Sequence, residues 1–226
     1  MKGNNMVTPS GIFEKHYADY CARISKIDLP PLAHVLGTEY DGERMIIPFF
    51  NQTYRVSSCG ITDESGNRPD YVRCVILAKY ILLCPESLLH DTQWVSFKDF
   101  KKTSHFTNVK FFESDTEQAI CKHFSGRCDE LARAGKLLGG MDDPMTMSYD
   151  LSMQFKVLPR ISLLLVFNDG DDEFAPQCKV LFQKHAEFYL DPESLAMTGA
   201  LLAGNLKKAC DRSTGDDDSI SRWAIE

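Results

Sequence analysis

The sequence predicts a single compact α+β domain over residues 11–210, in which helices pack on an antiparallel sheet. Two apolar runs of strand length, residues 161–167 and 180–182, are separated by an acidic loop. A helix of small and branched residues then begins at Pro192, directly after a capping Asp191. This order of strand, polar loop, strand and helix is typical of the centre of an α+β domain. Residues 1–10 and 211–226 are polar and are expected to be loose termini.

Composition narrows the class of protein. The 226 residues are 43% hydrophobic and 25% charged, as in a soluble globular domain. A net charge of -7 argues against general binding to nucleic acid or to anionic membranes. No apolar run reaches the roughly 20 residues of a membrane-spanning helix, and the start lacks the apolar stretch of a signal peptide. The eight cysteines form no C-x-x-C pair, which favours reduced thiols in a cytoplasmic protein.

The first half of the chain predicts two helices and a β-meander. Residues 12–27 have helical apolar spacing, with Ser10 as a candidate N-cap, and the Asp28-Leu-Pro-Pro sequence should end that helix. Residues 38–58 predict the meander, with turns at 41–42 and 51–52, and Pro48 should place its strand at an edge or a bulge. A loop over 61–70 and a buried helix over 71–84 are expected to follow.

The second half predicts a short strand over 94–97, a loop over 98–108 and two helices. The first of these helices should begin at Ser114 or Asp115 and run toward Phe124, and Gly126 should separate it from the second. The second helix should stop at the glycines 139–140, before a linker over 141–148. Residues 149–157 alternate as in a half-buried strand.

The loop over residues 168–173 is the densest carboxylate cluster. Its oxygens suit a hard cation, but the glutamate that closes a calcium-binding loop is missing, so an Asp-Gly turn with solvated charges is the simpler interpretation. If the loop is a site, Asp171 and Glu173 should share a face of an extended segment and point into a pocket, while Phe174 packs back onto the core.

Two other groups of polar residues are candidate sites. Cys121, His123 and Cys128 are metal-ligating types, but a fourth ligand is missing and a continuous helix would turn His123 away, so no metal is expected. His185 and Glu187 would share a strand face, although an exposed strand end is the commoner explanation. No phosphate-binding glycine loop or nucleophile elbow is present, so no cofactor and no catalytic residue is predicted.

Several short motifs together resemble one family. They are Gly37-x-x-Tyr40-Asp41-Gly42, Ile47-Pro48-Phe49, Tyr54-x-Val56, Trp94-x-Ser96-Phe97, Leu158-Pro159, Gly170-Asp171-x-Glu173-Phe174-x-Pro176, Val180-Leu181-Phe182, Tyr189-Leu190-x3-Ser194-Leu195-Ala196 and Gly199-x-Leu-Leu202. Over most of residues 12–209 the chain is similar to a domain family of unknown function from anaerobic bacteria and archaea. Some relatives are fused to a four-cysteine iron–sulfur segment similar to that of corrinoid iron–sulfur proteins. Here Cys21 stands alone, so no cluster is expected.

The resemblance implies a non-enzymatic ligand-binding or accessory module in anaerobic cofactor or one-carbon metabolism, with a small molecule or a protein as its partner. Two alternatives stay open: a small-molecule enzyme that uses the carboxylates of residues 171–173, and an interaction domain that forms a homo-oligomer. A concave pocket would favour the enzyme and a flat apolar patch would favour assembly. The candidate ligand-binding residues are Tyr40, Asp41, Trp94, Asp171, Glu173 and His185.

Overall fold

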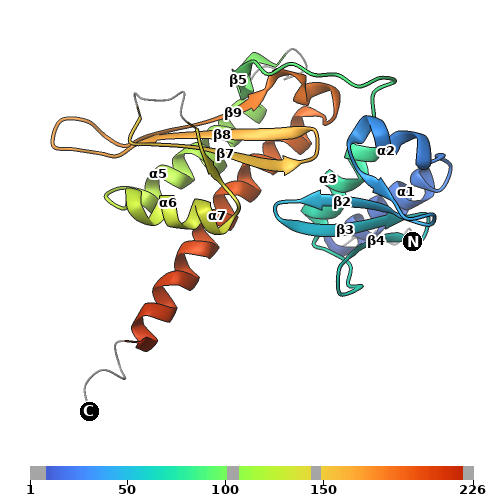
Figure 1. The fold of residues 1–226 in the computed structure, drawn as a ribbon, viewed down its shortest axis with the longest axis horizontal. Coiled ribbons are helices and arrows are strands. Elements are labelled where there is room, and N and C mark those ends of the chain that lie inside the picture. The colour runs from blue at the N-terminus through green and yellow to red at the C-terminus, as the bar shows by residue number, and fades with distance from the viewer. Residues whose placement is uncertain (1–8, 101–106, 144–148, 221–226) are drawn as a thin grey trace, which may run out of the picture.

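The computed structural model describes residues 9–100, 107–143 and 149–220. It has the predicted α+β class, but its strands form two antiparallel sheets, of four and five strands, where a single sheet was expected. Figure 1 shows the two sheets side by side, the first built by the N-terminal part of the chain and the second by the C-terminal part.

The first sheet is the predicted meander with one strand more. Its strands follow in sequence order: β1 (Glu39–Tyr40), β2 (Met45–Phe49), β3 (Gln52–Ser57) and β4 (Gly60–Asp63). The expectation that Pro48 places its strand at an edge or a bulge is wrong, because β2 lies between β1 and β3 in a regular register. The proline is tolerated because β1 pairs only with Met45 and Ile46 and does not reach it. The strand β4 takes up residues 61–63 of the predicted loop. Its Ile61 is only 1% exposed, and this burial adds to the pairing of β4 with β3.

Three helices accompany the first sheet: α1 (Pro9–Ile24), α2 (Pro30–Leu36) and α3 (Tyr71–Leu82). The helix α1 begins at Pro9, so Ser10 lies inside it and is not its N-cap. The prolines 30 and 31 were expected only to end a helix, but they also begin α2, since proline fits the first helical turn, where its missing N–H is not needed. The buried helix α3 was predicted, and the Asp70 side chain caps it by accepting the Arg73 amide at 2.9 Å.

The second sheet has the strand order β5 (Trp94–Ser96), β9 (Gln177–Gln183), β8 (Ile161–Asn168), β7 (Leu151–Leu158) and β6 (Met141–Asp142). The apolar run at 161–167 is its central strand, and it pairs with β7 on one side and β9 on the other. Both faces of β8 are buried, which explains why this segment does not alternate between apolar and polar residues.

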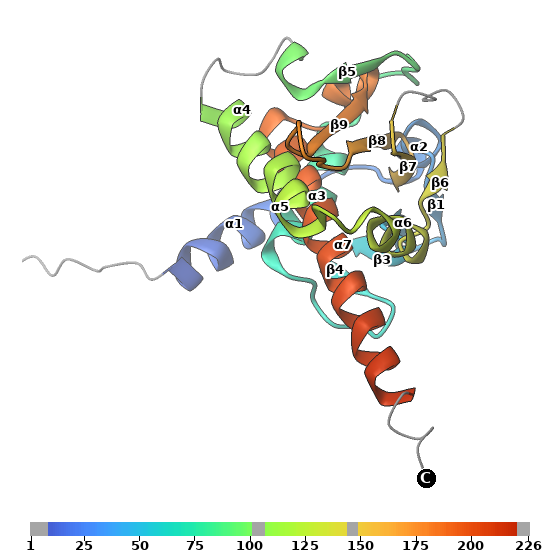
Figure 2. The same ribbon diagram turned by 90° about the vertical axis from the view of Figure 1, so that its left-hand side faces the viewer.

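Helices cover one side of the second sheet (Figure 2). They are α4 (Thr107–Phe112), the π-helical η2 (Glu113–Gln118), α5 (Ala119–Phe124), α6 (Cys128–Leu137) and α7 (Pro192–Ile220), with short 3-10 turns η1 (Phe97–Asp99) and η3 (Lys184–Phe188). The first helical run starts at 107, so Ser114 and Asp115 lie within it and do not cap it. The helix α7 continues to Ile220 through residues that were expected to be a loose tail. Residues 101–106 of the predicted loop and 144–148 of the predicted linker lie outside the described residues.

The turn between β7 and β8 joins the two sheets into one compact domain. Arg160, at this turn, donates from Nε to the Val35 carbonyl at 2.9 Å and from Nη2 to the His34 carbonyl at 2.8 Å, both at the end of α2. The phenol of Tyr80, on α3, donates to the Leu36 carbonyl at 2.6 Å and accepts the Arg160 amide at 3.1 Å. The carbonyls of Val35 and Leu36 are among those that a helix end leaves unpaired, whereas the His34 carbonyl also accepts the Gly37 amide at 3.3 Å.

Candidate functional site

The sequence-predicted site residues lie on separate parts of the fold. Tyr40 ends β1 and Asp41 follows it in the first sheet, whereas Trp94 begins β5 at the edge of the second sheet. Asp171 and Glu173 belong to the loop between β8 and β9, which lies at the far left of Figure 1, away from the first sheet. The fold therefore does not gather these residues into one site.

The carboxylate loop is a hairpin connection held by its own side chain. Asp171 Oδ1 accepts the amides of Glu173 and Phe174, at 2.9 and 2.7 Å, and these bonds lower the pKa of Asp171. Asp171 and Glu173 are exposed. The expectation that Phe174 packs onto the core is wrong, since this residue is 66% exposed. The interpretation of this loop as a turn with solvated charges accounts for its geometry.

His185 is buried and joins three segments of the chain. Its Nδ1 lies 3.0 Å from the Asp91 amide nitrogen and 2.7 Å from the Asp91 carbonyl oxygen, and its Nε2 lies 2.8 Å from the Arg160 carbonyl oxygen, so both ring nitrogens contact backbone groups. His185 lies in η3, not on an extended strand end, and Glu187 of the same turn is buried too. The exposed-end explanation for this pair is therefore wrong, and the geometry of His185 is that of a structural histidine.

The possible ligands Cys121, His123 and Cys128 do not meet. Cys121 donates to the Pro176 carbonyl at 3.6 Å, while His123 Nε2 lies 3.8 Å from an Asp211 carboxylate oxygen. In the described parts of the chain, no three His, Cys, Asp or Glu side chains are placed so that they could hold a metal ion.

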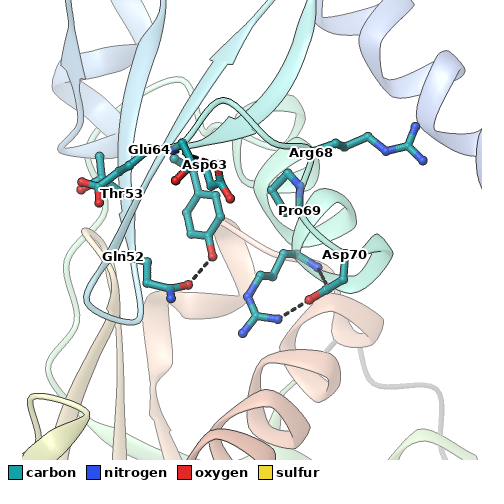
Figure 3. Close-up of a pocket in the computed structure, with 10 residues that line it drawn as sticks. Gln52, Thr53, Asp63, Glu64, Arg68, Pro69 and Asp70 are labelled. Carbon is teal, nitrogen blue, oxygen red and sulfur yellow. Dashed lines mark hydrogen bonds and ion pairs between the residues drawn. The ribbon is translucent and has the colours of Figure 1, made fainter.

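A polar pocket of about 470 Å³ opens beside the first sheet, between β3, the segment after β4 and the start of α3. Figure 3 shows Gln52 and Asp70 on opposite sides of it. Its lining residues are Gln52, Thr53, Tyr54, Asp63, Glu64, Ser65, Arg68, Pro69, Asp70 and Arg73. None of them belongs to the set predicted from the sequence. A volume of this size suits a small-molecule ligand.

Local turn chemistry builds one wall of the pocket. Asp63 Oδ1 accepts the amides of Ser65 and Asn67, at 2.9 and 2.8 Å, which folds the segment after β4 back on itself. Gly66, at φ 82°, supplies the left-handed residue that this tight loop needs. The loop then leads through Pro69 to Asp70, where α3 begins.

The tyrosine in the pocket is a hydrogen-bonding group. The Tyr54 side chain is almost entirely buried, and its phenol donates to Gln52 Oε1 at 2.6 Å. Burial raises the pKa of Tyr54, and the neighbouring Arg73 offsets this only in part. The phenol therefore stays protonated at neutral pH. The Gln52 side chain, which uses its oxygen to accept this bond, keeps its amide N–H groups as donors.

Arg73 provides the positive charge in the pocket. It pairs with Asp70 and also donates to Asn205 Oδ1 of α7 at 3.4 Å, so the α3 side of the pocket is tied to the C-terminal helix. The second arginine, Arg68, is turned away toward α1 (Figure 3). It makes two hydrogen bonds to the Glu14 carboxylate, at 2.9 and 2.5 Å.

With Arg68 neutralised by Glu14 and Arg73 by Asp70, the lining keeps an excess of negative charge from Asp63 and Glu64. The pocket thus presents the carboxylates of Asp63 and Glu64, the Gln52 amide on the β3 side and, on the α3 side, the Arg73 guanidinium in its pair with Asp70. Such an arrangement can bind a polar molecule that carries groups of both signs.

The sequence analysis did not predict this pocket, because a structural role accounted for each of its residues. Residues 61–70 were interpreted as a loop, and Tyr54 as part of a strand. A signal was present: Asp70 directly before the apolar helix pattern marks a helix start, and helix starts that follow polar loops often border ligand sites.

Among the described residues, no helix has both the length and the apolar character needed to span a membrane.

The molecule is thus an α+β protein of two antiparallel sheets with a polar pocket beside the first. A family model described as "Domain of unknown function (DUF3786)" matches residues 28–205, so the chain belongs to this family. The match covers the pocket lining and Asn205, but not the helix α1. No curated protein and no solved structure matches the chain.

Proposed function

We propose that this protein is a non-enzymatic binding module whose polar pocket takes a small zwitterion of the amino-acid type. The observation that carries this proposal is the mixture of charges in the lining: the carboxylates of Asp63 and Glu64, the guanidinium of Arg73 on α3 and the amide of Gln52 on β3. An ammonium group suits the carboxylates, and a carboxylate suits the guanidinium and the amide. A ligand with one sign of charge would leave one side of the pocket unmatched.

Binding, and not catalysis, suits the groups that line the pocket. Tyr54 has a raised pKa, so at neutral pH it donates a hydrogen bond and is a poor general base. Asp70 is engaged in capping α3 and in its pair with Arg73, which makes it a positioning group. These contacts hold the lining in place before a ligand arrives, which lowers the entropic cost of binding.

The resemblance described above supports a wider role in which the module serves anaerobic cofactor or one-carbon metabolism as an accessory protein in the cytoplasm. A binding module acts there by delivering or sensing its ligand. The pocket would set which ligand is recognised.

Thermal-shift measurements with matched probes test the ligand class. Glutamate carries both charges, whereas glutarate lacks the ammonium group and putrescine lacks the carboxylates. The standard amino acids are tested one at a time, and at least one of them should raise the Tm of the protein. A ligand at a hundred times its Kd stabilises the folded state by about 2.7 kcal/mol. Glutarate and putrescine at equal concentration and ionic strength should give smaller shifts than glutamate.

Variants locate the site. Tyr54→Phe and Gln52→Leu should reduce the shift given by the best amino acid, because each removes hydrogen-bonding groups of the lining. Tyr40→Phe is the matched control, since Tyr40 lies on β1 outside the lining. The proposal fails if no amino acid raises the Tm, or if Tyr54→Phe and Tyr40→Phe respond alike.

A further inference from the structure

Two cysteines far apart in the sequence meet where α5 packs on β9. Cys121 donates to the Pro176 carbonyl at 3.6 Å, two residues before Cys178, and an interaction between the thiols of Cys121 and Cys178 shifts the pKa of both. Cys178 is 5% exposed, whereas Cys121 is partly exposed. Cys121 is thus the more exposed of the two residues.

A buried glutamate holds the two elements together beside this pair. Glu117 precedes Cys121 by about one helical turn and is 7% exposed. Its Oε1 accepts the Val180 amide at 3.2 Å, and its Oε2 pairs with Lys179 Nζ at 2.7 Å. The strand β5 pairs with β9 only from Leu181 onward, so Glu117 takes the next amide along the open edge of β9.

The helix is therefore bonded to β9 on both sides of Cys178. Cys121 contacts residue 176, and Glu117 contacts residues 179 and 180. These contacts keep the two thiols side by side in the folded protein, without a change of fold. Neither cysteine lines the polar pocket beside the first sheet.

We propose that Cys121 and Cys178 form a thiol pair that a peroxide oxidises to an intramolecular disulfide. The Cys121 thiolate attacks one peroxide oxygen, the O–O bond breaks, and the departing oxygen is protonated to water, which leaves Cys121 as a sulfenic acid. The Cys178 sulfur then attacks the Cys121 sulfur and the S–O bond breaks. The leaving hydroxide takes the Cys178 proton and departs as a second water. Two thiols give up two electrons in total, and the peroxide accepts them.

The division of roles follows from the surroundings of each sulfur. The neighbouring Cys178 thiol lowers the pKa of Cys121, against the opposing effects of burial and of Glu117, and Lys179 adds to the lowering. The neighbouring Cys121 thiol, together with burial, raises the pKa of Cys178. Cys121 is accordingly the sulfur that ionises and meets the oxidant, and Cys178 resolves the sulfenic acid.

The test uses the full chain, reduced and then treated with equimolar hydrogen peroxide. Free thiols should fall from the eight of the sequence by two, and peptide mapping without reductant should find Cys121 linked to Cys178. Cys178→Ser should stop the reaction at a sulfenic acid on Cys121, which dimedone labels, and Cys121→Ser should slow thiol loss several-fold. Cys59→Ser is the control: Cys59 is the exposed thiol of the β3–β4 turn, and its loss should leave the linkage unchanged.

The parent protein alone decides the question if the buried Cys178→Ser variant does not fold. A linkage between other cysteines, or oxidation of Cys121 beyond the sulfenic acid without any linkage, overturns the proposal. So does equal thiol loss in the parent and in Cys121→Ser. Because the polar pocket lies beside the other sheet, failure of ligand binding there leaves this result untouched.

Discussion

Gly199 of α7 lies so close to Phe112 of α4 that a Cβ at position 199 would fall 2.4 Å from the Phe112 ring carbon Cε2. Thr116, in the π-helical turn η2, would be 2.9 Å away. The glycine thus allows the two helices to touch. Its neighbour Gly204, one turn and a half farther along α7, has no atom within 4 Å of such a Cβ.

The contact predicts opposite effects of the same substitution at two glycines of one helix. Gly199→Ala should destabilise the protein by about 1–3 kcal/mol, because the helices must shift apart, and Gly199→Leu should cost at least as much. Gly204→Ala should stabilise it by up to about 1 kcal/mol through helix propensity alone. Urea unfolding of the three variants measures this. Equal effects at 199 and 204 would show that α4 does not press on α7.

Arg160 is expected to contribute more to stability than a surface arginine. Arg160→Met removes the donors for the Val35 and His34 carbonyls and should lower the free energy of unfolding by about 1–3 kcal/mol. The matched control is Arg44→Met, since Arg44 is an exposed turn residue paired with Glu43, and this change should stay within about 0.5 kcal/mol. Denaturant unfolding compares the two, and similar losses would argue against the role of Arg160.

A structural role for His185 predicts loss of stability without a ligand. His185→Phe keeps the ring but leaves the Asp91 amide and the Arg160 carbonyl without their partner, at a cost of about 1–3 kcal/mol. His16→Phe, on the exposed side of α1, should be close to neutral. If thermal unfolding of His185→Phe matches that of the parent, the histidine is free to serve elsewhere.

Acid sensitivity is expected at the start of α7. Burial alone would raise the pKa of Asp191, but the pair with Lys79 at 2.8 Å and the bond from the Ser194 amide outweigh it and lower the pKa. A carboxyl with a lowered folded-state pKa stabilises the protein above its unfolded pKa near 3.9, and that stabilisation is lost as the pH falls further. Asp191→Asn should therefore lose less stability than the parent between about pH 5 and 2. If acid lowers the free energy of unfolding by the same amount in Asp191→Asn and in the parent, this assignment is contradicted.

The acidic hairpin loop yields a comparison between neighbouring carboxylates. Asp171→Ala should lower the Tm, because two backbone amides lose their acceptor, whereas Glu173→Gln should leave it unchanged. Asp171→Asn, which keeps an acceptor oxygen, should fall between them. Tm measurements with and without magnesium or calcium also test the idea of a cation site. If the metal raises the Tm of the parent but not that of Glu173→Gln, the loop does bind a cation.

Strong local patterns predicted much of the fold. The apolar run of β8, the Asp41-Gly42 turn and the capped start of α7 each depend on neighbouring residues, so the sequence predicts them directly. The extra strand β4 and the division into two sheets depend on partners elsewhere in the chain. No local pattern indicates which strands will share a sheet, so one sheet was expected.

The candidate site was harder to predict for the same reason. Tyr54 and Arg73 belong to a strand and a helix whose patterns are fully explained by packing, and only the fold brings them together. Asp171 and Glu173 were predicted as site residues because acidic residues cluster there in sequence, yet the Asp171 carboxylate serves to hold the turn. Clustering along the chain was therefore a poorer guide than convergence in space.

The hydrogen bond from Arg160 to Val35 spans 125 residues of sequence, so it can form only after the turn between β7 and β8 has been made. A growing chain reaches the turn between β7 and β8 long after α2 and the first sheet have been made. Until then the last carbonyls of α2 and the phenol of Tyr80 lack the partners that they have in the native state. Contacts of such long range are slow to form, so we expect the N-terminal part to stay incompletely ordered until the β7–β8 hairpin has folded against it. A fragment that ends before Pro159 should for this reason be more susceptible to proteases than the same residues in the whole chain.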